Sequence, residues 1–182
     1  MSDLSDPLEE IFGFCRQAID SVDQSKRELL IEGILSSRKV FIYGSGRSGL
    51  VGQLFAVRLV QLGFDVHFVG EMTTPIIGKD DLTILVSNTG RTSSVVQTAK
   101  IARKIGSRII SITSRFQSEL AKVSDVAIVL DLPSVEETSR TAPLGTVFED
   151  STLMFFECII CDIMEREGIT EDDMRSRHAI WV

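Results

Sequence analysis

The chain has 182 residues, of which 43% are hydrophobic and 25% are charged, and its formal net charge is −7. This length is enough for one domain with a real hydrophobic core. The acidic balance disfavours broad binding to nucleic acids or anionic membranes, because either polyanion would meet net repulsion.

The sequence also bears on the compartment. We find no run of the roughly 20 uninterrupted apolar residues that a membrane span requires. The first ten residues, MSDLSDPLEE, are acidic and lack an apolar signal core, so we expect no export. Three cysteines, an odd number, disfavour a disulfide framework. Together these features predict a cytoplasmic protein in a reducing compartment.

Two helices are predicted before the first strand. Asp6 is the expected N-cap of the first helix, with Pro7 at the first helical position and Glu9 completing a capping box. Apolar residues then recur at helical spacing, and a second helical pattern covers about residues 24–35. We expect these helices, within residues 1–37, to form an N-terminal arm that packs on the main domain or on another subunit.

From residue 38 onward, apolar strands alternate with helices. The expected strands cover residues 39–43, 65–69, 82–87, 108–113 and 125–132, and helices are expected at 48–63, 93–106 and about 118–123. Continuous apolar strands separated by helices predict a five-stranded parallel sheet covered on both faces, which is a three-layer α/β/α sandwich.

The C-terminal part of the sequence carries a loop and a long helix. Residues 132–145 are polar, contain two prolines and are interpreted as a surface loop. The helix at 146–168 is apolar on several sides, so we expect a subunit interface, with a deep core helix as the alternative. Cys158 and Cys161 fall in this helix and are interpreted as buried thiols rather than a metal or redox pair. A short helix is expected at 170–182.

The loop after the first strand reads Gly-Ser-Gly-Arg-Ser-Gly at residues 44–49. Such a G-x-G-x-x-G pattern between a strand and a helix is typical of dinucleotide sites, and Glu71 lies about where the ribose-binding acid would be expected. However, Ser45, Arg47 and Ser48 fill the gaps with hydrogen-bond donors, whereas a pyrophosphate approaches bare backbone. This loop alone therefore leaves a dinucleotide and a smaller phosphate ester both open.

A second donor-rich loop, Ser87 to Ser94, also follows a strand and opens a helix. The hydroxyl groups of Ser87, Thr89 and Thr92 surround Gly90, and a helix start adds free N–H groups and partial positive charge. A polar turn with serine and threonine caps is the alternative interpretation. Two such loops at the same sheet edge favour one phosphate ester shared between them.

Four segments of the chain carry a resemblance: YGSGRSGLVGQLFAVRLVQLG, VGEMTTPIIGKDDLTILVSNTGRT, APLGTVFEDS and MRSRHA. Together they are similar to the 6-phospho-3-hexuloisomerases, which are members of the sugar isomerase (SIS) domain group, and the likeness runs along nearly the whole chain in the same order. The resemblance implies a single SIS domain over residues 1–182 with a flavodoxin-like sheet. In this domain, residues 1–37 form the N-terminal helices and residues 38–182 form the α/β core with the C-terminal helices.

The resemblance also implies an activity and partners. The family interconverts D-arabino-hex-3-ulose 6-phosphate and fructose 6-phosphate through an enediol, needs no cofactor or metal, and tends to form homotetramers. The ribulose monophosphate pathway and a hexulose-6-phosphate synthase as pathway partner follow from the same likeness. The alternatives are a module that senses sugar phosphates and an isomerase of another phosphosugar.

The site residues that the resemblance implies lie in the two loops and the C-terminal part of the chain. Glu149 would be the catalytic base, and His178 would assist at the substrate oxygens. The implied substrate-binding residues are Ser45, Gly46, Arg47, Ser48, Ser87, Asn88, Thr89, Gly90 and Thr92.

Other interpretations of the charged residues remain open at the level of sequence. Thr146 and Glu149 have the spacing of a capping box, so Glu149 could serve only the helix start. His178 lies near a helix C-terminus, where cations are favoured on electrostatic grounds alone. His67 is flanked by apolar residues within a strand, and we expect it to be structural.

Overall fold

The structure is a computed structural model that describes residues 5–179, and its centre is a parallel sheet. The strands are β1 (Val40–Gly44), β2 (Val66–Phe68), β3 (Leu82–Val86), β4 (Arg108–Thr113) and β5 (Val126–Val129). They form one five-stranded parallel sheet in the order β2-β1-β3-β4-β5. This order confirms the predicted flavodoxin-like α/β fold.

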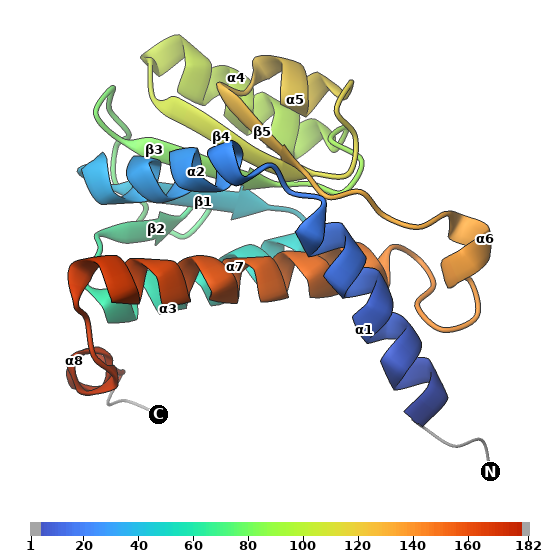
Figure 1. The fold of residues 1–182 in the computed structure, drawn as a ribbon. Helices are drawn as coiled ribbons and strands as arrows, with labels where there is room; N and C mark the ends of the chain where they lie inside the picture. The colour runs from blue at the N-terminus through green and yellow to red at the C-terminus, as the bar shows by residue number, and fades with distance from the viewer. Residues whose placement is uncertain (1–4, 180–182) are drawn as a thin grey trace.

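Helices cover both faces of the sheet (Figure 1). They are α1 (Ser5–Asp20), α2 (Gln24–Ser36), α3 (Arg47–Leu62), α4 (Ser93–Ile105), α5 (Glu119–Val123), α6 (Val135–Thr138), α7 (Thr146–Glu167) and α8 (Glu171–Ser176). The chain moves from β1 outward to β2 and then back to β3, so right-handed connections place α3 on one face and α4 and α5 on the other.

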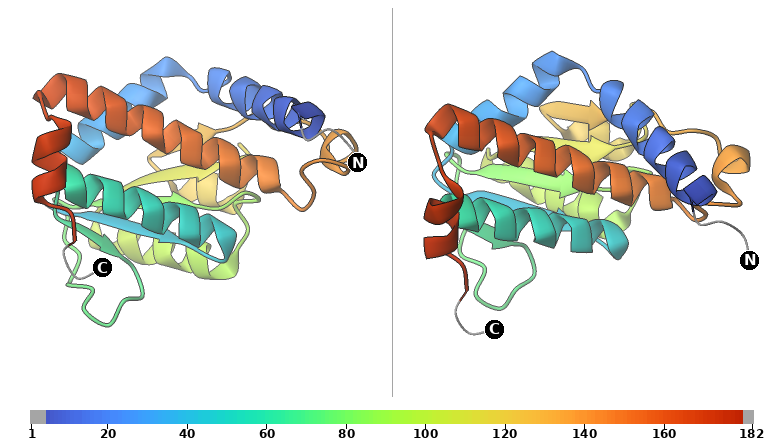
Figure 2. Two further views of the ribbon diagram at one scale, coloured as in Figure 1. Left: turned by 90° about the horizontal axis from the view of Figure 1, so that it is seen from below. Right: turned by 60° about the horizontal axis from the view of Figure 1, so that its bottom comes forward.

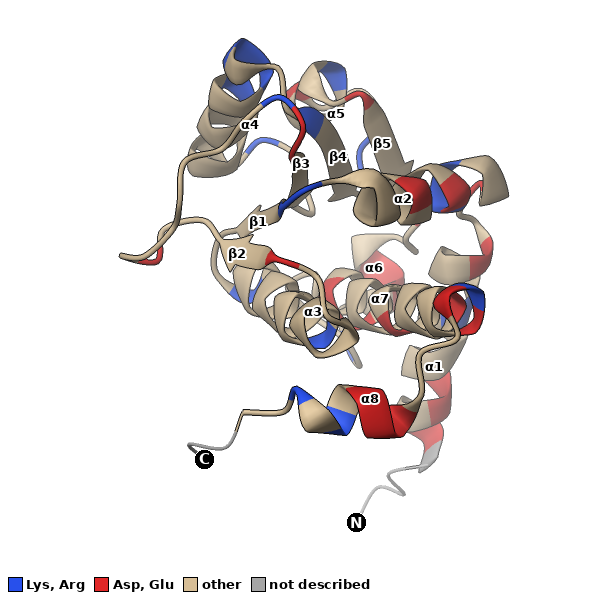
Figure 3. Cartoon of the chain, turned by 90° about the vertical axis from the view of Figure 1, so that its left-hand side faces the viewer, with Lys and Arg blue, Asp and Glu red and all other residues tan. Residues whose placement is uncertain are grey.

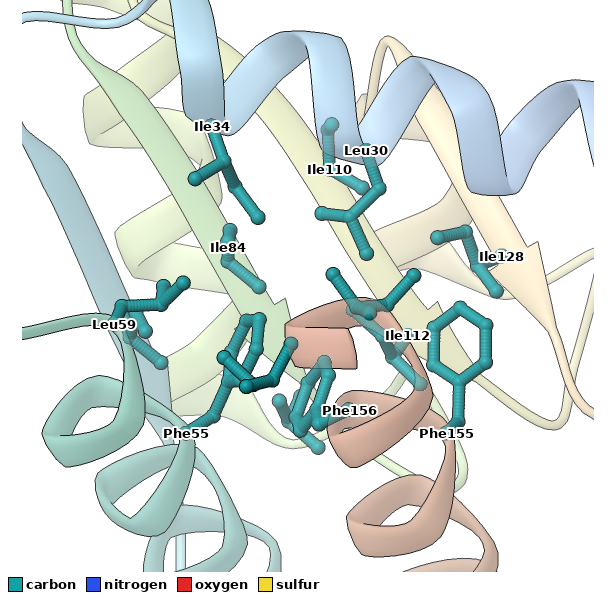
Figure 4. Close-up of a cluster of buried hydrophobic side chains, with 14 of the residues drawn as sticks. Leu30, Ile34, Phe55, Leu59, Ile84, Ile110, Ile112, Ile128, Phe155 and Phe156 are labelled. Carbon is teal, nitrogen blue, oxygen red and sulfur yellow. The ribbon is translucent and has the colours of Figure 1, made fainter. Parts of the chain in front are cut away.

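The larger core lies between the sheet and helices α2, α3 and α7 (Figure 4). Phe55 of α3 and Phe156 of α7 stack with ring centroids 3.9 Å apart and planes inclined by 5°. Both rings are buried, and burial of one such side chain contributes about 1.5–3 kcal/mol. The stack joins two helices that lie side by side in both views of Figure 2.

Helix α7 is covered largely within its own chain. Its large apolar residues include Phe148, Phe155 and Ile159, which are buried in the single chain. Helix α1 lies along the N-terminal half of α7, and α3 lies along another side (Figures 1 and 2). The described part of the chain therefore supports the core-helix alternative for α7, and the N-terminal arm packs on the main domain.

Several element boundaries differ from the sequence predictions. Helix α1 begins at Ser5, so Asp6 lies in its first turn rather than at its N-cap. The expected loop at 132–145 contains the short helix α6, which Ser134 caps with a complete capping box. The last helix ends at Ser176, and residues 180–182 lie outside the described residues.

The prediction that Cys158 and Cys161 are buried thiols is wrong. Both side chains are exposed on α7, and all three cysteines are free thiols in the described structure. The reason is helical geometry, because residues 158 and 161 lie on the side of α7 that neither the sheet nor a neighbouring helix covers. Buried residues such as Ile159 and Ile160 face the core instead.

Candidate active site

The register of the sheet brings the two donor-rich loops together. Gly44, the last residue of β1, pairs with Val86, the last residue of β3. The loop at 44–49 and the loop at 87–92 therefore leave the same sheet edge side by side. This edge is also the topological switch point between β1 and β3, where ligands of open α/β sheets bind.

The glycines of the first loop have a packing role. A Cβ atom on Gly49 would lie 2.6 Å from the carbonyl oxygen of Gly44, and one on Gly44 would lie 2.9 Å from the backbone nitrogen of Gly49. Gly46 has φ +59° and ψ −137°, a conformation that is essentially restricted to glycine. The G-x-G-x-x-G pattern is thus required to start α3 close to β1, whatever ligand binds there.

The second loop is held in a fixed shape by the neighbouring strand end. The carbonyl oxygen of Asn88 accepts hydrogen bonds from the backbone N–H and the hydroxyl of Ser114 and from the hydroxyl of Thr113. The hydroxyl oxygens of Ser87 and Thr92 lie 3.2 Å apart. The structure therefore brings the predicted residues Ser87, Asn88 and Thr92 into one preorganised turn.

The helices differ in whether a side chain caps their N-termini. Asp23, Ser118, Ser134 and Thr170 cap α2, α5, α6 and α8 with their side chains. Within the described residues, α3, α4 and α7 begin without a side-chain cap. These three helices start around the two loops, so their first N–H groups remain available to an anion.

Glu149 lies in the first turn of α7 and faces the first loop. The hydroxyl of Ser48 donates a hydrogen bond of 3.0 Å to Glu149 Oε1. The guanidinium of Arg47 forms an ion pair with the same carboxylate, with Nη2 3.0 Å from Oε2. The side chain of Glu149 is 11% exposed, whereas that of Arg47 is 52% exposed. Both residues of the first loop thus hold the carboxylate.

Burial raises the pKa of Glu149 above its ordinary value, and the nearby Asp150 raises it further. The hydrogen bond from Ser48 and the charge of Arg47 lower the pKa and offset part of this effect. A carboxyl group with a raised pKa in a polar recess is suited to accept a proton from a weakly acidic C–H bond.

The capping-box interpretation of Thr146 and Glu149 is wrong. The N-cap of α7 is Gly145, and no side-chain cap bond occurs there among the described residues. The hydroxyl of Thr146 instead donates to the carbonyl oxygen of Pro143. The carboxylate of Glu149 instead contacts Ser48 and Arg47 of the first loop.

The turn before α7 contacts both loops. Arg47 donates from Nη2 to the carbonyl oxygen of Leu144 and from Nη1 to Thr146 Oγ1 at 3.3 Å. A Cβ atom on Gly145 would lie 2.8 Å from Nδ2 of Asn88. Leu144 has φ +59° and is 91% exposed, which is unusual for a large apolar residue.

A cavity of about 870 Å³ adjoins this turn. Asn88 and Thr89 line one side of it, and residues between Asp131 and Val147 line the other. This volume is within the range of small-molecule sites. The remaining predicted residues of the first loop, Ser45 and Gly46, are exposed and do not line this cavity.

His178 lies at the other end of the molecule. It is exposed after α8 and lines a second cavity, of about 560 Å³, together with Arg58 and Met174. The 22 residues of α7 span about 33 Å, with Glu149 at the start and α8 beyond the end (Figure 1). A single chain therefore does not bring the two predicted catalytic residues together.

His67 lies within β2 and is half-buried. Its Nε2 is 2.8 Å from a carboxylate oxygen of Asp65, and its ring packs 5.5 Å from that of Phe41. This environment agrees with a structural role.

The described residues contain no group of three side chains that could ligate a metal ion. They also contain no helix of sufficient length and hydropathy to cross a bilayer.

Residues 33–156 match the SIS domain. The chain belongs to the SIS domain family. The 3-hexulose-6-phosphate isomerase of Methanocaldococcus jannaschii is 41% identical over 155 residues, covering 85% of the chain and 83% of the relative. That of Bacillus subtilis is 31% identical over 176 residues, covering 94% and 95%.

A solved SIS structure is also similar. The crystal structure of a hypothetical protein from Methanococcus jannaschii, with an inferred molecular function of 3-hexulose-6-phosphate isomerase, superposes with a TM-score of 0.86 at 37% identity. The superposition covers 98% of each chain. These findings confirm the family that the sequence motifs indicated.

The SIS sequence motifs did not indicate every residue that shapes the site. Leu144 and Ser114 contribute a carbonyl oxygen and a hydroxyl that hold Arg47 and Asn88. The only available signal was the Pro143–Gly145 turn, which predicts a bend without revealing what its carbonyl groups bind.

Proposed function

We propose that the protein interconverts D-arabino-hex-3-ulose 6-phosphate and fructose 6-phosphate, with Glu149 as the base. The observation that carries this proposal is the position of Glu149. Its carboxylate is buried beside two donor-rich loops, with Oε1 held by Ser48 and a raised pKa. The names of the similar isomerases support the same substrate.

The reaction moves a carbonyl group from C3 to C2 of the sugar. Glu149 removes the proton on C2, the electron pair of that C–H bond forms the double bond of an enediol, and the C3 oxygen takes up a proton. The same carboxyl group then returns a proton to C3 while the C2 oxygen loses its proton and becomes the carbonyl. One carboxylate can serve both carbons because they are directly bonded.

The loop at 87–92 would hold the phosphate ester. The hydroxyl groups of Ser87, Thr89 and Thr92 lie at the open start of α4, where backbone N–H groups and the helix dipole favour an anion. Binding energy at the phosphate fixes the orientation of the sugar carbons toward Glu149. Ser48, which we expected to bind substrate, donates to Glu149 in this structure and would thereby orient the base.

His178 would act from a second copy of the chain. Its position beyond the far end of α7 from Glu149 supports a second copy as the source of this imidazole. A neutral or charged imidazole is suited to move protons among the substrate oxygens near neutral pH. We therefore propose that residues 1–182 act as one SIS domain within an oligomer.

The surface of α3 supports such an assembly. Leu50, Leu54 and Val57 are exposed at helical spacing along this helix, and Figure 3 shows α3 drawn mainly as uncharged residues. An exposed apolar stripe of this kind is typical of an interface between subunits. The proposed homotetramer would act in the cytoplasm, in the ribulose monophosphate pathway beside a hexulose-6-phosphate synthase.

A direct assay tests the proposed function. The purified protein is incubated with D-arabino-hex-3-ulose 6-phosphate, and fructose 6-phosphate is measured with a coupled dehydrogenase. We expect steady turnover without added metal or nucleotide. Binding without turnover would instead favour a sensor of sugar phosphates, and turnover of only a pentose or heptulose phosphate would favour another phosphosugar isomerase.

A further inference from the structure

Arg47 occupies an unfavourable place for a cation. It is the first residue of α3, whose N-terminal end carries partial positive charge from the helix dipole. The first turn reads Arg-Ser-Gly-Leu, so no acid of this turn balances the charge. Its charge partner comes from α7, 102 positions further along the chain. This placement is unfavourable for stability, and a role of Arg47 in the site would explain it.

Arg47 also covers the oxygen of Glu149 that is free to act. Oε1 accepts the hydrogen bond from Ser48, whereas Oε2 is buried and accepts no hydrogen bond from the described residues. The closest cation to Oε2 is Nη2 of Arg47, at 3.0 Å. A substrate carbon can reach Oε2 only when this guanidinium moves aside.

The guanidinium is held over Glu149 by hydrogen bonds to the turn before α7. It donates to the carbonyl oxygen of Leu144 and to Thr146 Oγ1, and the rest of the side chain is half-exposed. Leu144 adopts a left-handed conformation that is strained for a residue with a Cβ atom. Release of its carbonyl oxygen would let the turn before α7 relax and open the adjoining cavity of about 870 Å³.

We propose that Arg47 is the specificity-determining residue of the enzyme, because it covers Glu149 until a phosphate ester draws the guanidinium away. This inference rests on the proposed function. A dianionic phosphate at the start of α4 carries more charge than one carboxylate and offers bidentate geometry to the guanidinium. The pairing of Gly44 with Val86 brings the loop of Arg47 next to that phosphate position.

The movement has two effects on the base. It uncovers Oε2, and it removes a positive charge that lowers the pKa of Glu149, so the carboxylate becomes more basic. Sugars without a phosphate group would then meet a covered and weaker base. Discrimination against them would appear in kcat as well as in KM.

The test divides the substrate into two pieces. Isomerisation of unphosphorylated D-arabino-hex-3-ulose is measured with and without sodium phosphite, whose dianion stands in for the phosphate ester. In the wild-type protein we expect phosphite to accelerate this reaction at least tenfold, with saturation. In Arg47→Ala we expect no acceleration by phosphite and at least tenfold lower kcat/KM for hexulose 6-phosphate, with a smaller loss on the unphosphorylated sugar.

Arg16→Ala is the matched control, because Arg16 forms an exposed ion pair with Asp20 on α1. It should retain every wild-type rate and the phosphite effect. Circular dichroism and thermal unfolding establish that both variants fold. Undiminished phosphite acceleration in Arg47→Ala would overturn the inference, and so would equal losses on both sugars, which would indicate a plain binding or catalytic role.

A second readout does not require activity. The protonation of Glu149 is followed by NMR of ¹³C-labelled glutamate carboxyl groups. We expect Glu149 to titrate at higher pH in Arg47→Ala than in the wild type, and phosphite to raise the wild-type value toward that of the variant. Identical titrations would contradict the covering role. Absence of turnover of hexulose 6-phosphate by the wild-type protein would contradict the proposed function alone.

Discussion

Glu149 illustrates how one carboxyl group acquires reactivity from its surroundings. Burial disfavours its charged form, while Ser48 and Arg47 favour it, and the net effect raises the pKa. Ser48 and Arg47 are neighbours in sequence but lie about 100 positions from Glu149. A short turn therefore sets both the orientation and the basicity of a residue on a distant helix.

Replacement of Glu149 by Gln keeps the shape of the side chain and removes its ability to accept a proton. We expect Glu149→Gln to lower kcat by about 10²–10⁴, as is typical for loss of a general base. The dissociation constant for fructose 6-phosphate, measured by calorimetry, should change by less than about tenfold, because the phosphate contacts remain. Glu167→Gln, at the exposed end of α7, is the control. Near-wild-type turnover in Glu149→Gln would exclude the proposed base.

The raised pKa of Glu149 predicts a pH dependence of both rate and stability. The base must be ionised, so kcat/KM should fall as the pH drops through the raised pKa. The folded state binds this proton more tightly than the unfolded chain, so the ionised carboxylate destabilises the folded protein at neutral pH. Glu149→Gln should therefore unfold at a higher temperature than the wild type at pH 7, and the difference should vanish below the ordinary pKa of 4.5. Equal melting temperatures at pH 7 would contradict this electrostatic account.

Residue types in the two loops were predictable from sequence, but most of their contacts were not. Hydroxyl groups after two apolar strands indicated a phosphate site, and the family motif indicated Glu149. Hydrogen bonds such as that from Ser48 to Glu149 join residues 101 positions apart, and no local pattern reveals them. The hydrogen bond from Arg47 to the carbonyl oxygen of Leu144 could not be predicted from side-chain chemistry, because its acceptor is a backbone atom.

At the scale of elements, the start of α4 depends on how closely the loop at 87–92 approaches α5. Gly90 has φ +59°, and its carbonyl oxygen accepts a hydrogen bond from the backbone of Leu120. A Cβ atom on Gly90 would lie 2.2 Å from Ser118 Oγ. The glycine thus lets the loop at 87–92 pack directly on Ser118, the N-cap of α5.

Gly90→Ala adds both backbone strain and a steric clash. We expect it to lower the free energy of unfolding by about 2–4 kcal/mol, measured by urea denaturation. Gly168→Ala is the matched comparison, because Gly168 has φ +65° but nothing lies within 4 Å of its added Cβ; strain alone should cost about 1 kcal/mol. Similar losses in both variants would show that the approach to Ser118 contributes nothing.

Periodicity predicted the strands and the long helices because their apolar residues face one continuous core. Periodicity predicted the first and last residues of helices and strands less accurately. Helix α6 is only four residues long and buries nothing, so its capping residues are its sole signal. The exposed cysteines of α7 show a related limit, since an apolar composition does not tell which side of a helix its neighbours cover.

At the scale of the whole molecule, the two predicted catalytic residues lie at opposite ends of α7. This separation predicts complementation between inactive variants. Glu149→Gln and His178→Ala should each lose at least about 10² in kcat. After mixed reassembly in equal amounts, roughly a quarter of the sites should combine an intact glutamate with an intact histidine, given random assembly of symmetric copies. Turnover of the mixture is the measurement, and a mixture as inactive as its parts would contradict a shared site.

The position of His178 could not be predicted from sequence, because the family motif fixes its identity but not its distance from Glu149. The fold supplied that distance through the length of α7 and the placement of α8 beyond its end. Sequence composition likewise did not indicate which apolar surface would remain exposed. The large apolar residues of α7 are buried within the single chain, whereas Leu50, Leu54 and Val57 of α3 remain exposed.

The separation of Glu149 and His178 along α7 has a kinetic consequence. If each chain carries the carboxylate at one tip of α7 and the imidazole beyond the other, an isolated chain holds two incomplete halves. The activity per chain then depends on protein concentration: dilution below the dissociation constant of the assembly abolishes activity without unfolding the chain, and activity rises more steeply than in proportion to the protein made.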